Sequence, residues 1–73
     1  MTQKPVPLTQ LPKGCRATVV QIDGSVADYL SGFGLYPGVE LKVHQRFPSF
    51  VIKADETELA IESDVAMQIL VIR

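Results

Sequence analysis

The sequence predicts a mainly β domain, a small five-stranded barrel with one short α-helix inserted after the first strand. Three observations predict it. Runs rich in β-branched residues recur along the chain, clusters of Pro, Gly and Asp separate them, and a single segment has clear helical periodicity. The sheet must close or nearly close, because open strand edges invite pairing with other chains. This order of elements fits an SH3-like barrel.

The composition narrows the class of protein. With 73 residues the chain makes one small domain, and its net charge of −1 gives no electrostatic reason to expect nucleic acid or an anionic membrane as partner. The single cysteine, Cys15, precludes an intrachain disulfide and favours a reducing compartment. No apolar run approaches the roughly 20 residues that span a bilayer, and prolines interrupt the N-terminus where a signal peptide would be apolar. We therefore expect a cytoplasmic protein without membrane insertion.

The N-terminal part divides into a tail and the start of the domain. Residues 1–7 are predicted to be a short tail, because their two prolines favour extended backbone and remove hydrogen-bond donors. The domain is expected to cover residues 8–73. Leu8 and Leu11 lie three residues apart, as in one helical turn laid on the core. Residues 16–22 (RATVVQI) are β-branched and predict the first strand.

A short helix is predicted after this strand. Ser25 is expected to begin it, because Asp28 follows three residues later in a pattern close to a capping box. One apolar stripe of helical spacing follows, made of Val26, Tyr29, Leu30 and Phe33. Gly34 comes next, where a left-handed residue closes a helix at little cost, and Leu35 would pack back on the final turn.

The stretch GFGLYPG, residues 32–38, raises the question of a phosphate-binding loop. A dinucleotide motif runs from strand to glycines to helix, whereas here the helix comes first and its negative C-terminal end would repel phosphate. Pro37 and Gly38 suit the centre of a β-turn instead. The stretch is therefore predicted to be structural, a helix cap followed by a turn.

The rest of the chain predicts four more strands. Residues 39–47 alternate, with an inward set of Val39, Leu41, Val43 and Phe47 and an outward set of Glu40, Lys42, His44 and Arg46. Residues 50–54, 58–62 and 67–72 predict the remaining strands. Ser63 and Asp64 can cap one helical turn before the last of them.

The candidate reactive residues do not assemble into a recognisable site. Cys15 and His44 are single residues far apart, with no paired ligands at metal-binding spacing, so we expect no metal site and at most an adventitious contact at His44. No cofactor motif is present. No serine has a histidine nearby in sequence, and so small a chain offers little volume for a closed pocket. We expect that the protein is not an enzyme.

The last strand indicates a contact surface. Ile69 and Val71 fall on one side and Leu70 and Ile72 on the other, so both faces are apolar. Either the segment around Leu8 and Leu11 covers the second face, or that face docks a partner. The candidate partner-binding residues are Tyr36, Phe50, Leu70 and Ile72, where Tyr36 is chosen because it lies in a turn outside the helix stripe.

Three motifs together resemble a known family. They are L-x-x-L-x-x-G at residues 8–14, L-x-x-F-G-L-x-P-G at residues 30–38 and E-L-A-I at residues 58–61. In this order and spacing they resemble FeoA, the small cytosolic protein of bacterial ferrous iron uptake, over about residues 8–72. The resemblance implies an SH3-like barrel. It also implies a non-enzymatic accessory role, in which the protein docks on the cytosolic part of FeoB, a membrane transporter with a GTP-binding domain.

Two departures from the family pattern bear on the partner surface. Family members often carry a Pro-Leu-Gly-Asp-Pro-like loop between the second and third strands, where this chain has the shorter Phe47-Pro48-Ser49-Phe50. The position of Asp28 is frequently basic in relatives. If either feature contacts the partner, the docking surface of this protein differs from theirs.

Two rival functions remain open from the sequence. One is a metal-responsive sensor or regulatory module, which resembles the C-terminal domain of iron-dependent repressors and would act as a dimer through an exposed strand edge. The other is a nucleic-acid-binding barrel, which would bind single strands with a steep salt dependence, and we expect no such binding. For the protein itself we expect a monomer or a weak homodimer. Because the net charge is near zero, the leading hypothesis predicts docking that is chiefly apolar and weakly sensitive to salt.

Overall fold

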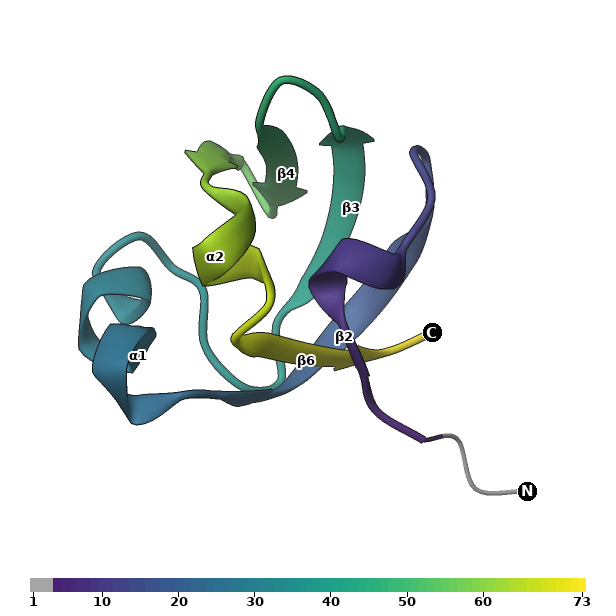
Figure 1. Ribbon diagram of the computed structural model, residues 1–73. Helices are drawn as coiled ribbons and strands as arrows, with labels where there is room; N and C mark the ends of the chain where they lie inside the picture. Colours follow the sequence, from purple (N-terminus) through teal and green to yellow (C-terminus); the bar gives the residue numbers. More distant parts are fainter. Residues whose placement is uncertain (1–3) are drawn as a thin grey trace.

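The computed structural model describes residues 4–73, which form a six-stranded antiparallel sheet in the order β1-β6-β2-β3-β4-β5 (Figure 1). The elements along the chain are β1 (Val6–Pro7), the 3-10 helix η1 (Leu8–Gln10), β2 (Arg16–Ile22), α1 (Gly24–Ser31), β3 (Glu40–Gln45), β4 (Phe50–Ala54), β5 (Thr57–Ile61), α2 (Ser63–Ala66) and β6 (Ile69–Ile72). The sheet curls around one apolar interior, so the predicted mainly β, SH3-like fold is confirmed. None of the helices within residues 4–73 is long and apolar enough to cross a membrane.

The sheet contains one strand more than the sequence predicts. Val6 and Pro7, which the sequence analysis assigned to a tail, pair with β6 opposite Val71 and Leu70 respectively. A pair of residues that includes a proline carries no alternating pattern, and proline is tolerated at the edge of a sheet. The strand therefore arises from the edge that β6 offers, which is a long-range contact that no local sequence signal reports.

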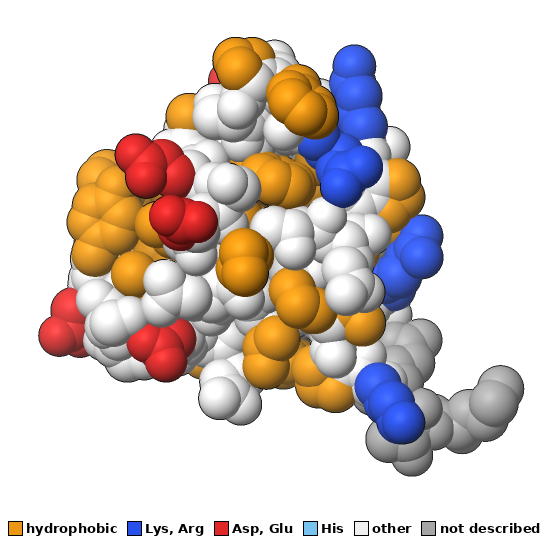
Figure 2. All heavy atoms as spheres, in the orientation of Figure 1, with side chains coloured by type: hydrophobic (Ala, Val, Ile, Leu, Met, Phe, Trp, Pro, Cys, Tyr) orange, Lys and Arg blue, Asp and Glu red, His pale blue; other side chains and the backbone are white. Residues whose placement is uncertain are grey.

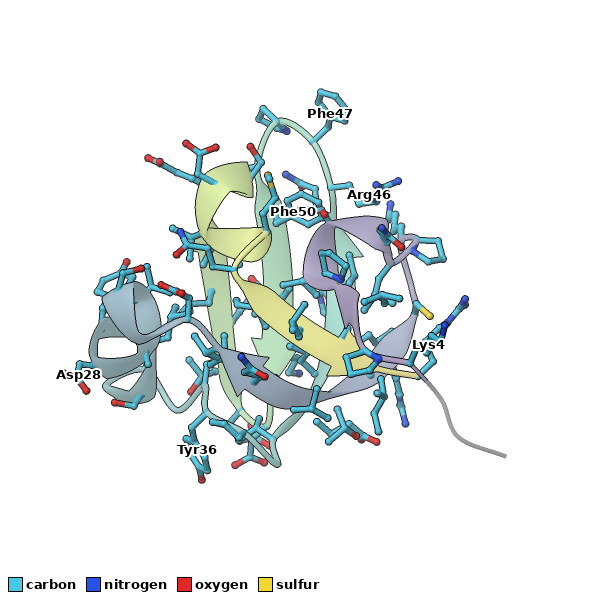
Figure 3. The ribbon with its side chains drawn as sticks, turned by 60° about the horizontal axis from the view of Figure 1, so that its bottom comes forward. Lys4, Asp28, Tyr36, Arg46, Phe47 and Phe50 are labelled. Atoms are coloured by element: carbon cyan, nitrogen blue, oxygen red, sulfur yellow. The ribbon has the colours of Figure 1, made fainter. Side chains whose placement is uncertain are left out.

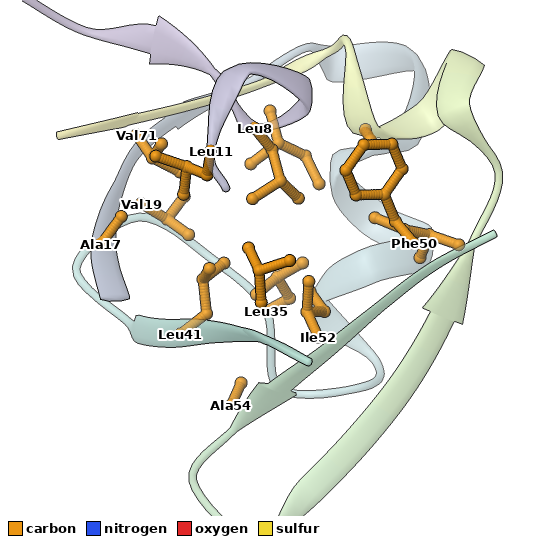
Figure 4. Packing of buried hydrophobic residues seen from close by; sticks show 14 of the residues in the cluster. Leu8, Leu11, Ala17, Val19, Leu35, Leu41, Phe50, Ile52, Ala54 and Val71 are labelled. Carbon is orange, nitrogen blue, oxygen red and sulfur yellow. The ribbon is translucent and has the colours of Figure 1, made fainter. Parts of the chain in front are cut away.

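The interior of the barrel is almost wholly aliphatic (Figure 4). Leu8 and Leu11, from the N-terminal segment, are both fully buried in it, beside Val71 of β6. These leucines therefore enter the barrel and do not cover the outer face of β6. On that outer face Leu70 and Ile72 remain half-buried.

Helix α1 begins with Asp23 as its N-cap, which corrects the expectation that Ser25 caps it. The Asp23 carboxylate accepts hydrogen bonds from the backbone N–H of Ser25, at 3.0 Å, and from the Ser25 hydroxyl. Asp competes well for this position because its short side chain reaches the backbone N–H two residues ahead. The hydrogen bonds from the Ser25 hydroxyl and N–H hold the pKa of Asp23 below its ordinary value of 3.8.

The end of α1 is a Schellman motif centred on Gly34. The Gly34 N–H donates to the Ser31 carbonyl at 3.0 Å, and the Leu35 N–H donates to the Leu30 carbonyl at 3.1 Å. Gly34 has φ of +87°, and the side chains of Leu30 and Leu35 are both buried. The motif thus returns the chain to the core one residue after the glycine.

The turn at Pro37-Gly38 then leads into β3. Gly38 has φ of +100°, and the Val39 N–H donates to the Tyr36 carbonyl at 3.1 Å. Gly38 also donates to the Val19 carbonyl at 2.7 Å, which ties the turn to β2. GFGLYPG is therefore a helix cap followed by a turn, and the N–H groups of its three glycines, Phe33 and Leu35 all donate to carbonyls within the fold.

Three expectations about individual side chains are wrong. In the helix stripe Leu30 is buried, but Tyr29 and Phe33 are exposed and their ring centroids lie 5.3 Å apart in an edge-to-face pair. Phe47, expected to point inward, is exposed, because the β3–β4 register shifts after Val43 and β3 ends at Gln45. Ser63 makes no side-chain cap for α2.

We predict that Gly34→Ala destabilises the protein by about 1–2 kcal/mol, because an L-residue is strained in a left-handed conformation. A Cβ at Gly34 meets no atom within 4 Å, so the cost is conformational. Gly24→Ala is the matched control, since Gly24 has equally open space without a positive φ and should change stability by less than about 1 kcal/mol. Urea unfolding of both variants measures the difference. Equal effects at both positions would contradict the prediction.

We also predict a pH-dependent contribution from Asp23. Because its folded pKa is depressed, its stabilising effect is fully present above its ordinary pKa of 3.8 and is lost as the pH falls through the folded value. Asp23→Ala should therefore lower the unfolding midpoint at pH 7 and approach the native protein at about pH 2. Asp23→Asn keeps a capping acceptor without the charge and is the control. A deficit for Asp23→Ala that stays constant down to that pH would refute the assignment.

Candidate docking surface

The described part of the chain gathers no cluster of potential metal ligands. Residues 4–73 contain no group of three or more His, Cys, Asp or Glu side chains placed to hold a metal ion. The sole histidine, His44, lies with its Nδ1 atom 3.2 Å from Oε2 of Glu58, and Cys15 is a half-buried free thiol. The surface instead exposes several aromatic side chains.

Most of the aromatic side chains lie outside the barrel. The chain has five aromatic residues, and four of them are substantially exposed: Tyr29 (58%), Phe33 (45%), Tyr36 (53%) and Phe47 (85%). Only Phe50 belongs to the core, with 6% exposed. Aromatic side chains are enriched in the buried centres of protein–protein interfaces, where they supply large contact areas. Their exposure makes this aromatic surface a candidate docking surface.

One of these side chains stands beside a groove. The loop between β3 and β4 approaches η1 and α2, and the groove of about 310 Å³ between them is lined by Thr9, Arg46, Phe47, Pro48, Ser49, Phe50 and Ser63. Phe47 projects from the loop at its rim, whereas Phe50, at the start of β4, points toward the interior (Figure 3). We call this feature the Phe47 groove. Segments far apart in the sequence meet there, so only the folded chain forms it.

Arg46 fixes one side of the Phe47 groove. Its Nη2 atom donates a hydrogen bond of 2.9 Å to the carbonyl oxygen of Thr9, and its guanidinium carbon lies 5.8 Å from the centroid of the Phe50 ring. The first contact joins the end of β3 to the N-terminal segment, and the second is within cation–π range. The guanidinium is thereby held in place, and its remaining N–H donors are available to a ligand.

The four predicted contact residues do not form one surface. Phe50 lines the Phe47 groove, whereas Tyr36 lies at the opposite end of the molecule (Figure 3). Leu70 and Ile72 share the outer face of β6, where Leu70 is paired with Pro7 on one side and Gln21 on the other. The structure therefore separates three places: the Phe47 groove, the Tyr36 turn and the outer face of β6.

Sequence reasoning missed Phe47 and Arg46 as parts of a groove. Alternation assigned Phe47 to the core and Arg46 to a solvated face. A usable signal was present in the Phe47-Pro48 pair, because a proline ends pairing and makes the continuation of a strand through position 47 doubtful. The contact between Arg46 and Thr9 joins residues 37 positions apart and had no such signal.

The fold is similar to those of solved FeoA structures and of IdeR. A crystal structure of an iron uptake regulatory protein, FeoA, is 27% identical with a TM-score of 0.84, covering 93% of this chain and 95% of that one. FeoA from Chlorobium tepidum is 26% identical with a TM-score of 0.82, covering 92% and 70% of the two chains. IdeR from T. acidophilum has a TM-score of 0.87 at 24% identity, and the chain spans 35% of its length. That last likeness shows the fold alone.

The sequence comparisons agree with the structures. No curated protein sequence matches the chain. The model of the FeoA domain matches residues 6–73, a range that begins at β1 and includes every described strand. The chain therefore belongs to the FeoA family, which is linked to iron uptake.

Proposed function

We propose that this protein is a non-enzymatic, cytoplasmic accessory protein of ferrous iron uptake that docks on the cytosolic part of a FeoB-like transporter. Membership of the FeoA family supports the assignment to ferrous iron uptake. The observation that carries docking is the exposure of Phe47, 85% of whose side chain faces solvent at the rim of an apolar groove. Large exposed aromatics beside a pocket have the form of interface anchors.

The Phe47 groove accommodates an apolar side chain of the partner. Burying one such side chain together with the Phe47 ring contributes on the order of 2–3 kcal/mol each. Arg46 at the rim can donate to a carbonyl or carboxylate of the partner with the N–H groups that Thr9 does not use. The contact is then chiefly apolar with one directional hydrogen bond, which fits weak dependence on salt.

The other predicted contacts lie at two further places, the outer face of β6 and the turn before β3. Leu70 and Ile72 are half-buried on the outer face of β6, and Val20 nearby on β2 is 36% exposed. Tyr36 lies in the turn before β3. The Gly38 N–H donates a hydrogen bond to the Val19 carbonyl and thereby ties this turn to β2. We propose these three, Tyr36, Leu70 and Ile72, as additional contacts that a large transporter domain reaches beyond the groove.

A metal-responsive regulatory module is the second candidate, and the likeness to IdeR supports it at the level of fold. His44 and Glu58 already place two potential ligand atoms 3.2 Å apart. Titration of the purified protein with Zn²⁺ or Fe²⁺ discriminates the two functions. Tight stoichiometric binding that His44→Ala abolishes would establish the module, whereas the docking proposal expects none.

We predict that Phe47→Ala weakens binding to the purified cytosolic domain of the transporter about tenfold or more, because it removes the exposed anchor. Isothermal titration calorimetry measures the affinity. Phe33→Ala is the matched control, since Phe33 is also an exposed phenylalanine but lies outside the groove, at the end of α1. Phe47 has no part in the core, so circular dichroism should show an unchanged fold. An unaltered affinity for Phe47→Ala would remove the groove from the interface.

The contacts proposed at these two further places have their own test. Leu70→Ser, Ile72→Ser and Tyr36→Ala should each weaken binding by a smaller factor, about twofold to fivefold, with native circular dichroism. The affinity of the native protein should change less than about threefold between 50 and 300 mM salt, a range that brackets physiological screening. A collapse of binding over that range would contradict apolar docking. Normal ferrous iron uptake by a strain that lacks the gene would contradict the accessory role itself.

A further inference from the structure

Three cations lie side by side across the outer face of the sheet. Arg16 of β2 is paired directly with Lys42 of β3, and Lys42 is paired directly with Lys53 of β4. Lys53 is paired on its other side with Glu58 of β5, where the row of cations ends. All three side chains are exposed. None of them forms an ion pair with a carboxylate anywhere in residues 4–73, where the salt bridge present joins His44 and Glu58. We call this row the cation ladder.

The cation ladder opposes the stability of the sheet. Like charges directly opposite each other on neighbouring strands repel, and Lys42 has a cation opposite it on both sides, so a neutral side chain there would pair better. Lys53 differs, because Glu58 lies opposite it on β5. The protein as a whole has a small net negative charge, so the row reflects local segregation and not a general excess of cations. Figure 2 shows such segregation on one face, with acidic side chains on the side of α1 and α2 and basic ones at the opposite edge.

The cation ladder borders a hollow of about 500 Å³ that is also lined by Glu40, Leu41, His44 and Asp55. The carboxylates of Glu40 and Asp55 place negative charge in the same hollow as the three cations. A diffuse polyanion such as nucleic acid would meet both of them along with the cations. A protein segment can instead present its carboxylates only to the three cations, which favours a protein ligand over a polyphosphate.

The spacing of the cation ladder matches that of a helix. Neighbouring strands lie about 4.8 Å apart, so the side chains of Arg16, Lys42 and Lys53 leave the sheet at nearly equal intervals. Side chains four residues apart on an α-helix have Cβ atoms about 5–6 Å apart along one face. We propose that the cation ladder docks the acidic face of a helix of a protein partner, with Asp or Glu at positions i, i+4 and i+8. This surface is distinct from the Phe47 groove, and the proposal does not depend on docking to the transporter.

The test uses the full-length protein and a synthetic helical peptide with Glu at every fourth position. Titration followed by NMR should perturb the resonances of Arg16, Lys42 and Lys53, and the affinity should fall at least fivefold between 50 and 300 mM salt. Lys42→Gln should weaken binding about fivefold. Lys4→Gln, which removes the same charge outside the cation ladder, should change binding less than twofold. A peptide with Gln in place of Glu should not bind.

A second readout separates ligand binding from a structural role. Because Lys42→Gln removes repulsion from both neighbours, the unfolding midpoint of this variant should equal or exceed that of the native protein while peptide binding is lost. A lower midpoint, or undiminished peptide binding by Lys42→Gln, would overturn the proposal. It would equally fail if inorganic phosphate, single-stranded DNA or anionic phosphatidylglycerol vesicles bound more tightly than the peptide. Self-association dependent on Lys42, seen by sedimentation velocity, would assign the cation ladder to a second copy of the chain and refute the helix.

Discussion

The barrel depends on the double pairing of β6. This last strand is hydrogen-bonded to β2 on one side and to β1 on the other, so it joins the end of the chain to its beginning. Its inward residues, Ile69 and Val71, are fully buried among leucines from the N-terminal segment. Without β6 the interior would be open to water on the side where Leu8 and Leu11 lie, and burial of apolar area is the dominant favourable term for so small a domain.

The way that interior is filled decides what remains outside. Aliphatic side chains from both termini and from every long strand occupy the core, and Phe50 is the one aromatic side chain that enters it. The remaining aromatics of α1, the following turn and the β3–β4 loop are left at the surface. Most of the aromatic area therefore lies on the surface, and this distribution supports the proposal that the protein docks on a partner.

Strand β3 connects two of the surfaces that we assign to partners, the cation ladder and the Phe47 groove. Lys42 lies near its start in the cation ladder, and Arg46 follows its end in the Phe47 groove. Between them the register with β4 shifts after Val43, so the chain leaves the regular sheet before it reaches the groove. A regular β3 would have turned Phe47 toward the core, because side chains alternate between faces along a strand. The irregularity thus converts a core position into an exposed anchor.

The sequence by itself determined the mainly β barrel, the place of the helix and the end of that helix at Gly34, because alternation, helical spacing and glycine conformation are local properties. It also supported the family, through three motifs spread over most of the chain. Only the tertiary structure decided that Val6 and Pro7 form a strand, that Phe47 is exposed and that Arg46 reaches Thr9. Each of these rests on a partner distant in the chain or on a register shift between strands. Pro48 is a local sign that β3 ends near Phe47, but the pairing of Val6 and Pro7 and the reach of Arg46 to Thr9 have no local sign.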